Sequence, residues 1–169
     1  MANDDQYPDF DALCRAVGFT VLTWAHIEQI LDAAIAVVFQ NCGGNKIDQQ
    51  IPRNLKSKLV FMRKSLRKIN VLEPFQEQGL ALMDRISNMK QRRHDVVHGV
   101  VTSLTSSDGS FEFRRLNVKN TMHHVESSDF DLKKFPALAR DLSDLGTDMV
   151  QFCQALAQEL VTPPRQSRP

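Results

Sequence analysis

Arginines and histidines that could act on a phosphate group gather in the segment Arg92–Gly99. Arg93 and His98 are five residues apart, which places them about 140° apart around a helix, whereas His94 and His98 share one face. A guanidinium binds phosphate through a two-pronged contact, and an imidazole can donate or accept a proton near neutral pH. This spacing therefore indicates a site that binds an anion and moves a proton.

The same residues also have a purely structural interpretation. The C-terminal end of a helix concentrates partial negative charge, which favours a protonated histidine, while Arg93 opposes that protonation. An arginine and a histidine there often cap carbonyl groups or pair with an acid such as Asp95. The two interpretations differ in one observable, because catalytic side chains should be exposed in a groove and structural ones should be buried and satisfied.

A metal site is a further alternative for this segment. His94 and His98 have the spacing of two zinc ligands, and the sequence between them is one methylene away from the HExxH motif. The shorter Asp95 is a poor match for the general base, and no third ligand follows at a familiar spacing, although His123 and His124 could come near. We therefore expect no metal. The sequence also shows no glycine-rich phosphate loop and no serine or cysteine nucleophile motif, so we expect no cofactor.

The apolar pattern predicts a mainly α-helical fold, with the motif at the end of a helix. Apolar side chains recur every three or four residues over 10–39, and the glycines after Cys42 should end this first helix. Proline favours the first turn of a helix, so Pro52 and Pro74 should open the second and third helices. Gly99 should cap the third.

After the third helix the pattern changes to short alternating runs, which are typical of β-strands. We expect a β-hairpin over residues 100–118 and a third short strand over 121–126. Asp129 or Asp131 should then cap a last helix that ends at about Val161. The predicted fold is thus a helical bundle with a small β insertion before the last helix.

Glu28 interrupts the apolar stripe of the first helix, four residues after Trp24 and three before Leu31. A carboxylate in such a position usually needs a partner. It could reach toward Arg93 and His98, or it could pair with a buried basic group or lie at the exposed edge of the stripe.

The formal net charge of +1 hides a strongly basic segment in the middle of the chain. Seven lysines and arginines lie between Pro52 and Asn70, with no acidic residue among them. Such a run can attract a polyanion, or it can be only the solvated face of a helix. The residues that we single out as candidate RNA contacts are Arg53, Lys56, Arg63, Lys64 and Arg67.

Length and composition favour one domain over residues 1–161, followed by a polar tail over 162–169 that we expect to be disordered. No stretch approaches twenty apolar residues, so we expect no membrane span. The three cysteines are far apart and odd in number, which fits a reducing compartment, and the first residues lack an apolar signal core. We therefore expect a cytoplasmic protein.

The motif Arg93-His94-Asp95-Val96-Val97-His98, followed by Gly99, resembles the signature of the HEPN superfamily, in which an arginine, a polar residue and three others precede a histidine. Trp24–Glu28 followed by Leu31 is also similar to many members, as is the order of the helices. The resemblance covers roughly residues 10–161 and implies an up-and-down helical bundle. The predicted hairpin has no counterpart in the minimal bundle.

The resemblance also implies a function, because many HEPN proteins are metal-independent ribonucleases in which the RNA 2′-hydroxyl attacks the scissile phosphate. Carried over, Arg93 would stabilise the charged phosphorane, His98 would be the acid or base, and His94 would stand at the family's polar position. Arg92 could substitute for Arg93, and we name Arg92, Asp95 and Glu28 as supporting residues.

The partners that the resemblance implies are a second copy of the chain, RNA, and an antitoxin or a small nucleotidyltransferase. A homodimer would bring two motifs together across its axis. We therefore expect a metal-independent endoribonuclease of the toxin or defence type. Some HEPN folds bind without cutting, so the alternative is a non-catalytic dimeric module that binds RNA or protein.

Overall fold

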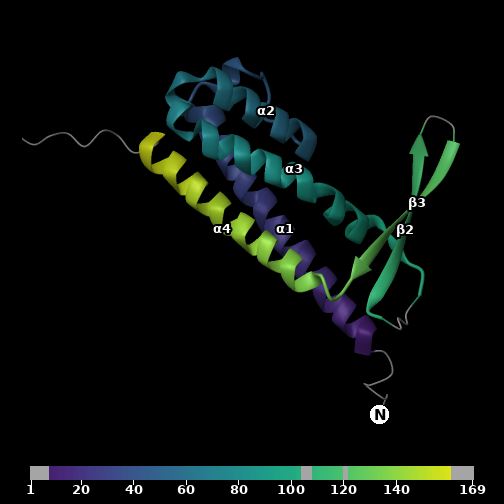
Figure 1. Ribbon diagram of the computed structural model, residues 1–169. Helices are drawn as coiled ribbons and strands as arrows, with labels where there is room; N and C mark the ends of the chain where they lie inside the picture. The colour runs from purple at the N-terminus through teal and green to yellow at the C-terminus, as the bar shows by residue number, and fades with distance from the viewer. Residues whose placement is uncertain (1–7, 104–107, 120–121, 161–169) are drawn as a thin grey trace, which may run out of the picture. The chain divides into compact units, whose positions relative to one another are not determined.

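The computed structural model describes residues 8–103, 108–119 and 122–160. Within them, four α-helices make up most of the chain and a small antiparallel sheet precedes the last helix (Figure 1), which confirms the predicted fold class. The tail predicted over 162–169 lies outside the described residues. In chain order the elements are α1 Pro8–Asn41, η1 Gly44–Lys46, α2 Leu55–Lys68, η2 Asn70–Phe75, α3 Gln76–His98, β1 Val100–Val101, β2 Ser110–Lys119, β3 Met122–Asp131 and α4 Phe135–Leu160.

The chain divides into two compact units, and the division falls inside three of the helices. The first unit, Met1–Trp24 with Met89–Ser143, contains the start of α1, the end of α3, the sheet and the start of α4. The second unit, Ala25–Asn88 with Asp144–Pro169, contains α2 and the remaining parts of the long helices. A single domain over 1–161 stays a prediction.

The long helix α1 contributes one buried face to the core, and only about a third of its most apolar stretch is buried. Its buried apolar side chains follow the predicted spacing and are Leu13, Ala16, Trp24, Ile27, Leu31, Ala34, Ile35 and Val38. Between Asp9 and Asn41 this helix is long and apolar enough to cross a membrane, by length and composition only, so the absence of a membrane span stays a prediction. The core helix of a soluble protein has the same length and composition, and the chain is compatible with a soluble protein. A cytoplasmic location stays a prediction.

The starts of α2 and α3 differ from the sequence prediction. α2 begins after Asn54 rather than at Pro52, because the Ser57 backbone N–H donates to Asn54 Oδ1 at 2.9 Å and caps the helix. α3 begins at Gln76, because Pro74 lies in the short 3₁₀ helix η2 that precedes it. Proline marked the right segments, but the first helical turn lies beyond it in both.

In the second unit the helices approach closely at a glycine. A Cβ at Gly79 of α3 would lie 2.7 Å from Leu66 Cδ1 of α2 and 3.0 Å from Phe152 Cζ of α4. Phe152 also meets Phe75 edge to face, with ring centroids 6.3 Å apart. The absence of a side chain at Gly79 therefore lets α3 pack against both neighbours.

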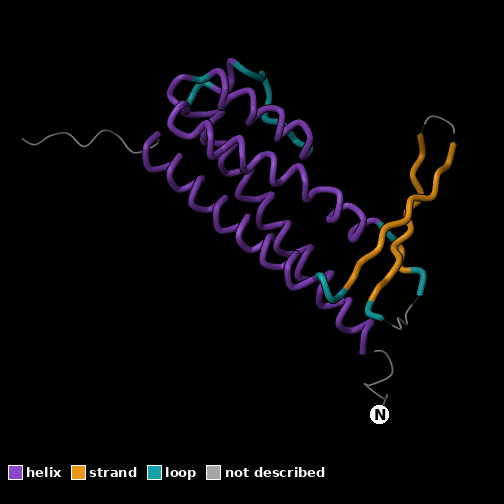
Figure 2. Tube along the Cα trace, viewed as in Figure 1, coloured by secondary structure: helices purple, strands orange, loops and turns teal. Residues whose placement is uncertain are grey.

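The sheet has the strand order β1-β2-β3 and is antiparallel throughout. Figure 2 shows the strands between the end of α3 and the start of α4. β2 and β3 pair over ten residues, while β1 pairs with β2 only at Val100↔Arg114 and Val101↔Phe113. The predicted hairpin is thus present as β1 and β2, although residues 104–107 of its turn lie outside the described residues.

The third strand is longer than predicted, and this shifts the start of the last helix. β3 continues to Asp131, so neither Asp129 nor Asp131 caps α4, which begins at Phe135. Asp131 Oδ1 instead accepts the backbone N–H of Lys133 at 2.9 Å in the connecting turn. The prediction placed the helix start too early because it assigned the polar end of β3 to a cap.

Phenylalanines join the parts of the first unit. Phe113 and Phe130 lie on the buried face of the sheet with ring centroids 6.1 Å apart, and Phe130 lies 6.2 Å from Phe135 at the start of α4. Phe135 in turn meets Phe19 of α1 edge to face at 5.8 Å. This chain of rings joins the sheet to α4 and to α1.

Candidate functional site

The motif occupies the last two turns of α3, within the first unit. Val96 is buried and anchors this end of the helix, so the other faces are available to solvent. His94 and His98 are exposed, while Arg93 and Asp95 are half-buried. The N–H of Gly99 donates to the Asp95 carbonyl at 2.8 Å. Gly99 does not adopt the left-handed conformation of a glycine cap, so it closes α3 in a different way from the one predicted.

A shallow groove of about 470 Å³ runs along His94 and His98, whose rings lie 4.7 Å apart. Because β1 is only two residues long, β2 continues beyond it, and this part of β2 faces the end of α3. The other side chains that line the groove are Val100, Arg114, Arg115, Leu116 and Asn117. The sequence prediction that the two histidines share one face agrees with this arrangement.

Both arginines of the groove have carboxylate partners. Arg114 pairs with Glu112 at 2.9 Å, and its hydrogen bond is the main cause that lowers the pKa of the Glu112 carboxyl. Arg115 Nη2 donates to Glu126 Oε2. The charges of these two arginines are therefore largely balanced by neighbouring carboxylates.

Arg115 is the centre of a network that ties α3 to the sheet. Its side chain is only 13% exposed, and Glu126, its carboxylate partner, also accepts Asn117 Nδ2 at 2.9 Å. Arg115 Nη1 lies 3.7 Å from Asp95 Oδ1, which accepts Gln91 Nε2 at 2.8 Å. Nη1 itself is buried and has no hydrogen-bond acceptor in the described part of the chain. Asp95 is thus a support for the sheet rather than the partner of the motif arginine.

The two arginines of the motif lack such support. Neither Arg92 nor Arg93 makes a hydrogen bond or an ion pair with any residue in the described ranges. The structural interpretation expected a buried and satisfied pair, and Arg93 does not fit that expectation. Arg93 is also not among the residues that line the groove of His94 and His98. This agrees with the angle of about 140° around the helix axis that separates Arg93 from His98.

Arg114, Arg115 and Asn117 are residues that the sequence reasoning missed. Phe111, Phe113 and Leu116 are apolar residues of β2, but the spacing of three from Phe113 to Leu116 puts these two side chains on opposite faces of the strand. In the structure Arg115 shares the inner face with the two phenylalanines, while Leu116 is 63% exposed. Because side chains of a strand alternate between its two faces, counting every second residue from Phe111 would have placed Arg115 on the inner face of the sheet.

The basic helix α2 belongs to the second unit, and its side chains have different roles. Arg63 donates to the Met83 carbonyl at 3.0 Å and to Asp84 Oδ1 at 2.7 Å, and the buried Lys58 donates to Asp32 at 2.8 Å. These two cations hold helices together. The candidate RNA contacts that remain exposed are Arg53, Lys56, Lys64 and Arg67.

Two further predictions concern Glu28 and metal ligands. Glu28 is half-buried and lies in the second unit, so its predicted reach toward the motif stays a prediction. His123 and His124 are exposed on β3. Among the described residues, no three or more histidine, cysteine, aspartate or glutamate side chains gather closely enough to hold a metal ion.

No protein-family model, curated protein or solved structure matches this chain. The likeness to the HEPN superfamily therefore rests on the motif that begins at Arg93, on the segment around Trp24 and on the order of the helices. The function that this likeness implies is a proposal.

Proposed function

We propose that this protein is a metal-independent endoribonuclease of the HEPN type, in which Arg93 and His98 act on the scissile phosphate. One observation carries the proposal: the end of α3 exposes His98 in a groove and leaves Arg93 without a carboxylate partner among the described residues. A structural pair would be buried and satisfied. A guanidinium without a carboxylate partner and an exposed imidazole on the same helix end suit an anionic substrate that accepts or gives a proton.

The reaction assigns a different task to each side chain. The RNA 2′-oxygen attacks the neighbouring phosphorus and loses its proton, the bond from phosphorus to the 5′-oxygen breaks, and the leaving oxygen gains a proton. In this proposal His98 moves one of these protons and His94, whose ring lies 4.7 Å from that of His98, moves the other. Arg93 is half-buried, so its charge acts on the phosphorane with less screening by water.

The proposal includes a homodimer. Arg93 and His98 diverge by about 140° on one helix, so a single phosphate is more easily reached by Arg93 of one protomer and His98 of the other. A two-fold axis near the end of α3 would create two such composite sites. The exposed cations of α2 would supply attraction to RNA that does not depend on its sequence.

The biological setting follows from the same resemblance. A nuclease of this type would act in the cytoplasm as a toxin or in defence, and an antitoxin or a small nucleotidyltransferase would restrain it. These assignments depend on the proposed ribonuclease activity.

A second candidate function is a non-catalytic dimeric module that binds RNA or protein. The observation that favours it is that Arg93 does not line the groove of the two histidines. In that case the cations at the end of α3 would bind phosphates, and no RNA would be cleaved.

The experiment that separates the two candidates compares four single variants in the presence of EDTA. Arg93→Ala should lower the rate of RNA cleavage by about 100-fold or more, and His98→Ala by about 100- to 10,000-fold. Lys90→Ala and His123→Ala are matched controls, because both side chains are exposed and lie outside the groove. The controls should change the rate of RNA cleavage by less than about threefold. This is much smaller than the loss expected when a residue that transfers a proton is removed. Binding of RNA by the wild-type protein without any cleavage would instead establish the module.

A further inference from the structure

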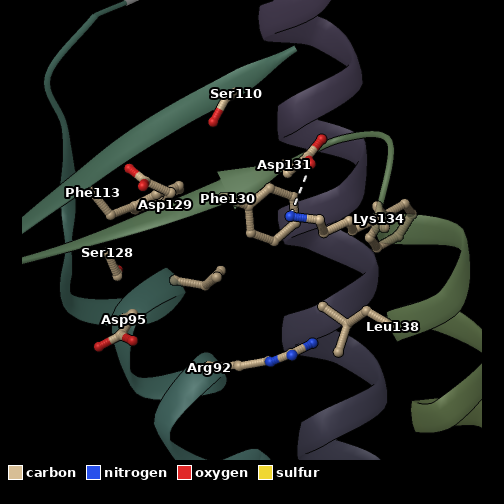
Figure 3. A pocket seen from close by; sticks show the side chains of 12 residues that line it. Arg92, Asp95, Ser110, Phe113, Ser128, Asp129, Phe130, Asp131, Lys134 and Leu138 are labelled. Atoms are coloured by element: carbon tan, nitrogen blue, oxygen red, sulfur yellow. Dashed lines mark ion pairs between the residues drawn. The ribbon is translucent and has the colours of Figure 1, made fainter. Parts of the chain in front are cut away.

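The first unit contains a second cavity, of about 340 Å³, which shares no lining residue with the histidine groove. Its walls come from the end of α3, from β2 and β3, and from the start of α4 (Figure 3). Its volume lies at the small end of the range for ligand pockets, which is about 300–1,000 Å³. The cavity therefore has room for one small molecule or for one unit of a polymer.

One part of the lining is apolar and aromatic. Phe113, Phe130 and Phe135 follow one another at ring-centroid distances of 6.1 and 6.2 Å, and Leu138 and Val96 complete this part. Aromatic rings favour offset or edge-to-face contacts with another ring. This lining suits a planar, partly apolar group.

Arg92 supplies a positive charge to the same cavity, whose lining also contains Lys134 and the carboxylates of Asp95, Asp129 and Asp131. In Figure 3 its guanidinium extends toward Leu138. The other cation of the lining, Lys134, pairs with Asp131 at 3.4 Å, and Asp95 accepts Gln91. Asp129 is exposed and lies opposite Glu112 in the strand ladder, so it offers an acceptor at the rim. Arg92 is thus the cation of this lining that has no partner among the described residues, and it calls for an anion on the ligand.

A hollow of about 330 Å³ shares Asp95, Phe113 and Ser128 with this cavity and is lined by Arg115 as well. The buried Nη1 of Arg115 has no hydrogen-bond acceptor among the described residues, and a buried donor normally has one. A carbonyl oxygen on the ligand would satisfy it. A ligand that fits the two hollows together would have a planar ring, a carbonyl group and an anionic group.

We propose that this cavity holds one nucleotide of single-stranded RNA, with its base against the phenylalanines, a base carbonyl toward Arg115 and its phosphate on Arg92. The inference rests on the proposed ribonuclease function, because Arg92 adjoins Arg93 and a nucleotide bound here would flank the scissile phosphate. The base would be unstacked, as sequence-selective proteins require of single-stranded RNA. The cavity would therefore select the position of cleavage.

The test measures binding rather than cleavage. The probe is a fluorescent single-stranded oligonucleotide with 2′-O-methyl groups, which lacks the attacking hydroxyl, and a second probe has one nucleotide without its base. Base stacking on aromatic side chains is worth about 1–3 kcal/mol, so the intact probe should bind about 5- to 150-fold more tightly. Uridine and guanosine monophosphate serve as competitors. Competition would assign the site to free nucleotides as well, and its absence would assign it to nucleotides within a chain.

Two variants test whether the tighter binding of the intact probe arises in this cavity. Ser128→Phe fills the cavity and should abolish the difference between the two probes, and Arg92→Ala should weaken binding of both probes. Lys90→Ala removes an exposed cation of α3 that does not line the cavity, and it should keep the preference for the intact probe.

The outcomes separate this inference from the proposed function. Equal binding of both probes by the wild-type protein, an unchanged preference in Ser128→Phe, or unchanged binding of both probes by Arg92→Ala would overturn the nucleotide pocket even if RNA is cleaved. Loss of the preference in Ser128→Phe together with weaker binding of both probes by Arg92→Ala, in a protein that cleaves no RNA, would support the pocket and reject the ribonuclease.

Discussion

Arg115→Ala should destabilise the protein because it removes a nearly buried cation that joins β2 to β3 and to the end of α3. The side chain is 13% exposed, and the variant leaves the carboxylates of Glu126 and Asp95 without it. Hydrogen bonds to charged groups contribute about 1.5–3 kcal/mol, and breaking a fully buried ion pair costs about 3–5 kcal/mol. Glu126 is 39% exposed and Asp95 is 21% exposed, so solvent relieves part of the cost. We expect the free energy of unfolding to fall by about 2 kcal/mol.

Arg114→Ala is the matched control, because Arg114 is the adjacent residue and is also paired with a carboxylate. Its side chain is 56% exposed, and a pair at the surface contributes about 0–1 kcal/mol. Urea unfolding of both variants measures the difference. The double variant Arg115→Ala/Glu126→Ala should be more stable than Arg115→Ala alone, because it also removes a carboxylate that would otherwise have lost its cation. Equal losses for the two single variants would refute the reasoning that burial decides the contribution.

Gly99→Ala should lower the free energy of unfolding by about 1–3 kcal/mol, because its Cβ would collide with the backbone carbonyl oxygen of Asp95 and lie 2.9 Å from Phe113 Cβ. Gly18→Ala in α1 should raise the free energy of unfolding by about 0.5–1 kcal/mol, because the added Cβ would have no neighbouring atom within 4 Å and alanine favours a helix. Urea titrations in which both glycine variants change stability in the same direction would contradict this. Burial raises the pKa of the Cys42 and Cys153 thiols, so less thiolate is present and iodoacetamide should label the exposed Cys14 first, as peptide mass spectrometry would show. Light scattering at micromolar concentration should give roughly twice the chain mass of 19.2 kDa, and a monomer mass would count against the dimer.

The long helices could be predicted from the sequence because many residues contribute to the same periodic signal. In α4, for example, apolar side chains that recur every three or four residues are buried from Leu138 to Leu156. Helix ends depend on single local contacts, and the Asn54 side chain decides the start of α2 more strongly than Pro52 does.

The length of β3 could not be predicted in the same way. The segment that contains Ser127 and Ser128 is polar and does not alternate, so it carries no strand signal of its own. Its pairing with β2 supplies the backbone hydrogen bonds that make it a strand. The cavity at Arg92 was missed for the same reason, because β3 forms one of its walls.

The candidate site was predicted in part. The motif lies at the end of a core helix as expected, since helical spacing and the position of Gly99 are both local properties of the sequence. The contacts of Arg115 are not local, because Asp95 and Glu126 come from elements that only the fold brings near. Whether Arg93 and His98 meet at one phosphate depends on a second copy of the chain and stays a proposal.

Cleavage of single-stranded RNA in EDTA by the wild-type protein and by Arg93→Ala/His98→Ala tests the central claim most directly, with the ends of the products identified by mass spectrometry. We predict that the wild-type products end in a 2′,3′-cyclic phosphate, because the 2′-hydroxyl attacks. The double variant should cleave no faster than the background. Full cleavage by the double variant, after contaminating nucleases have been excluded, would contradict the claim that the end of α3 is the catalytic site.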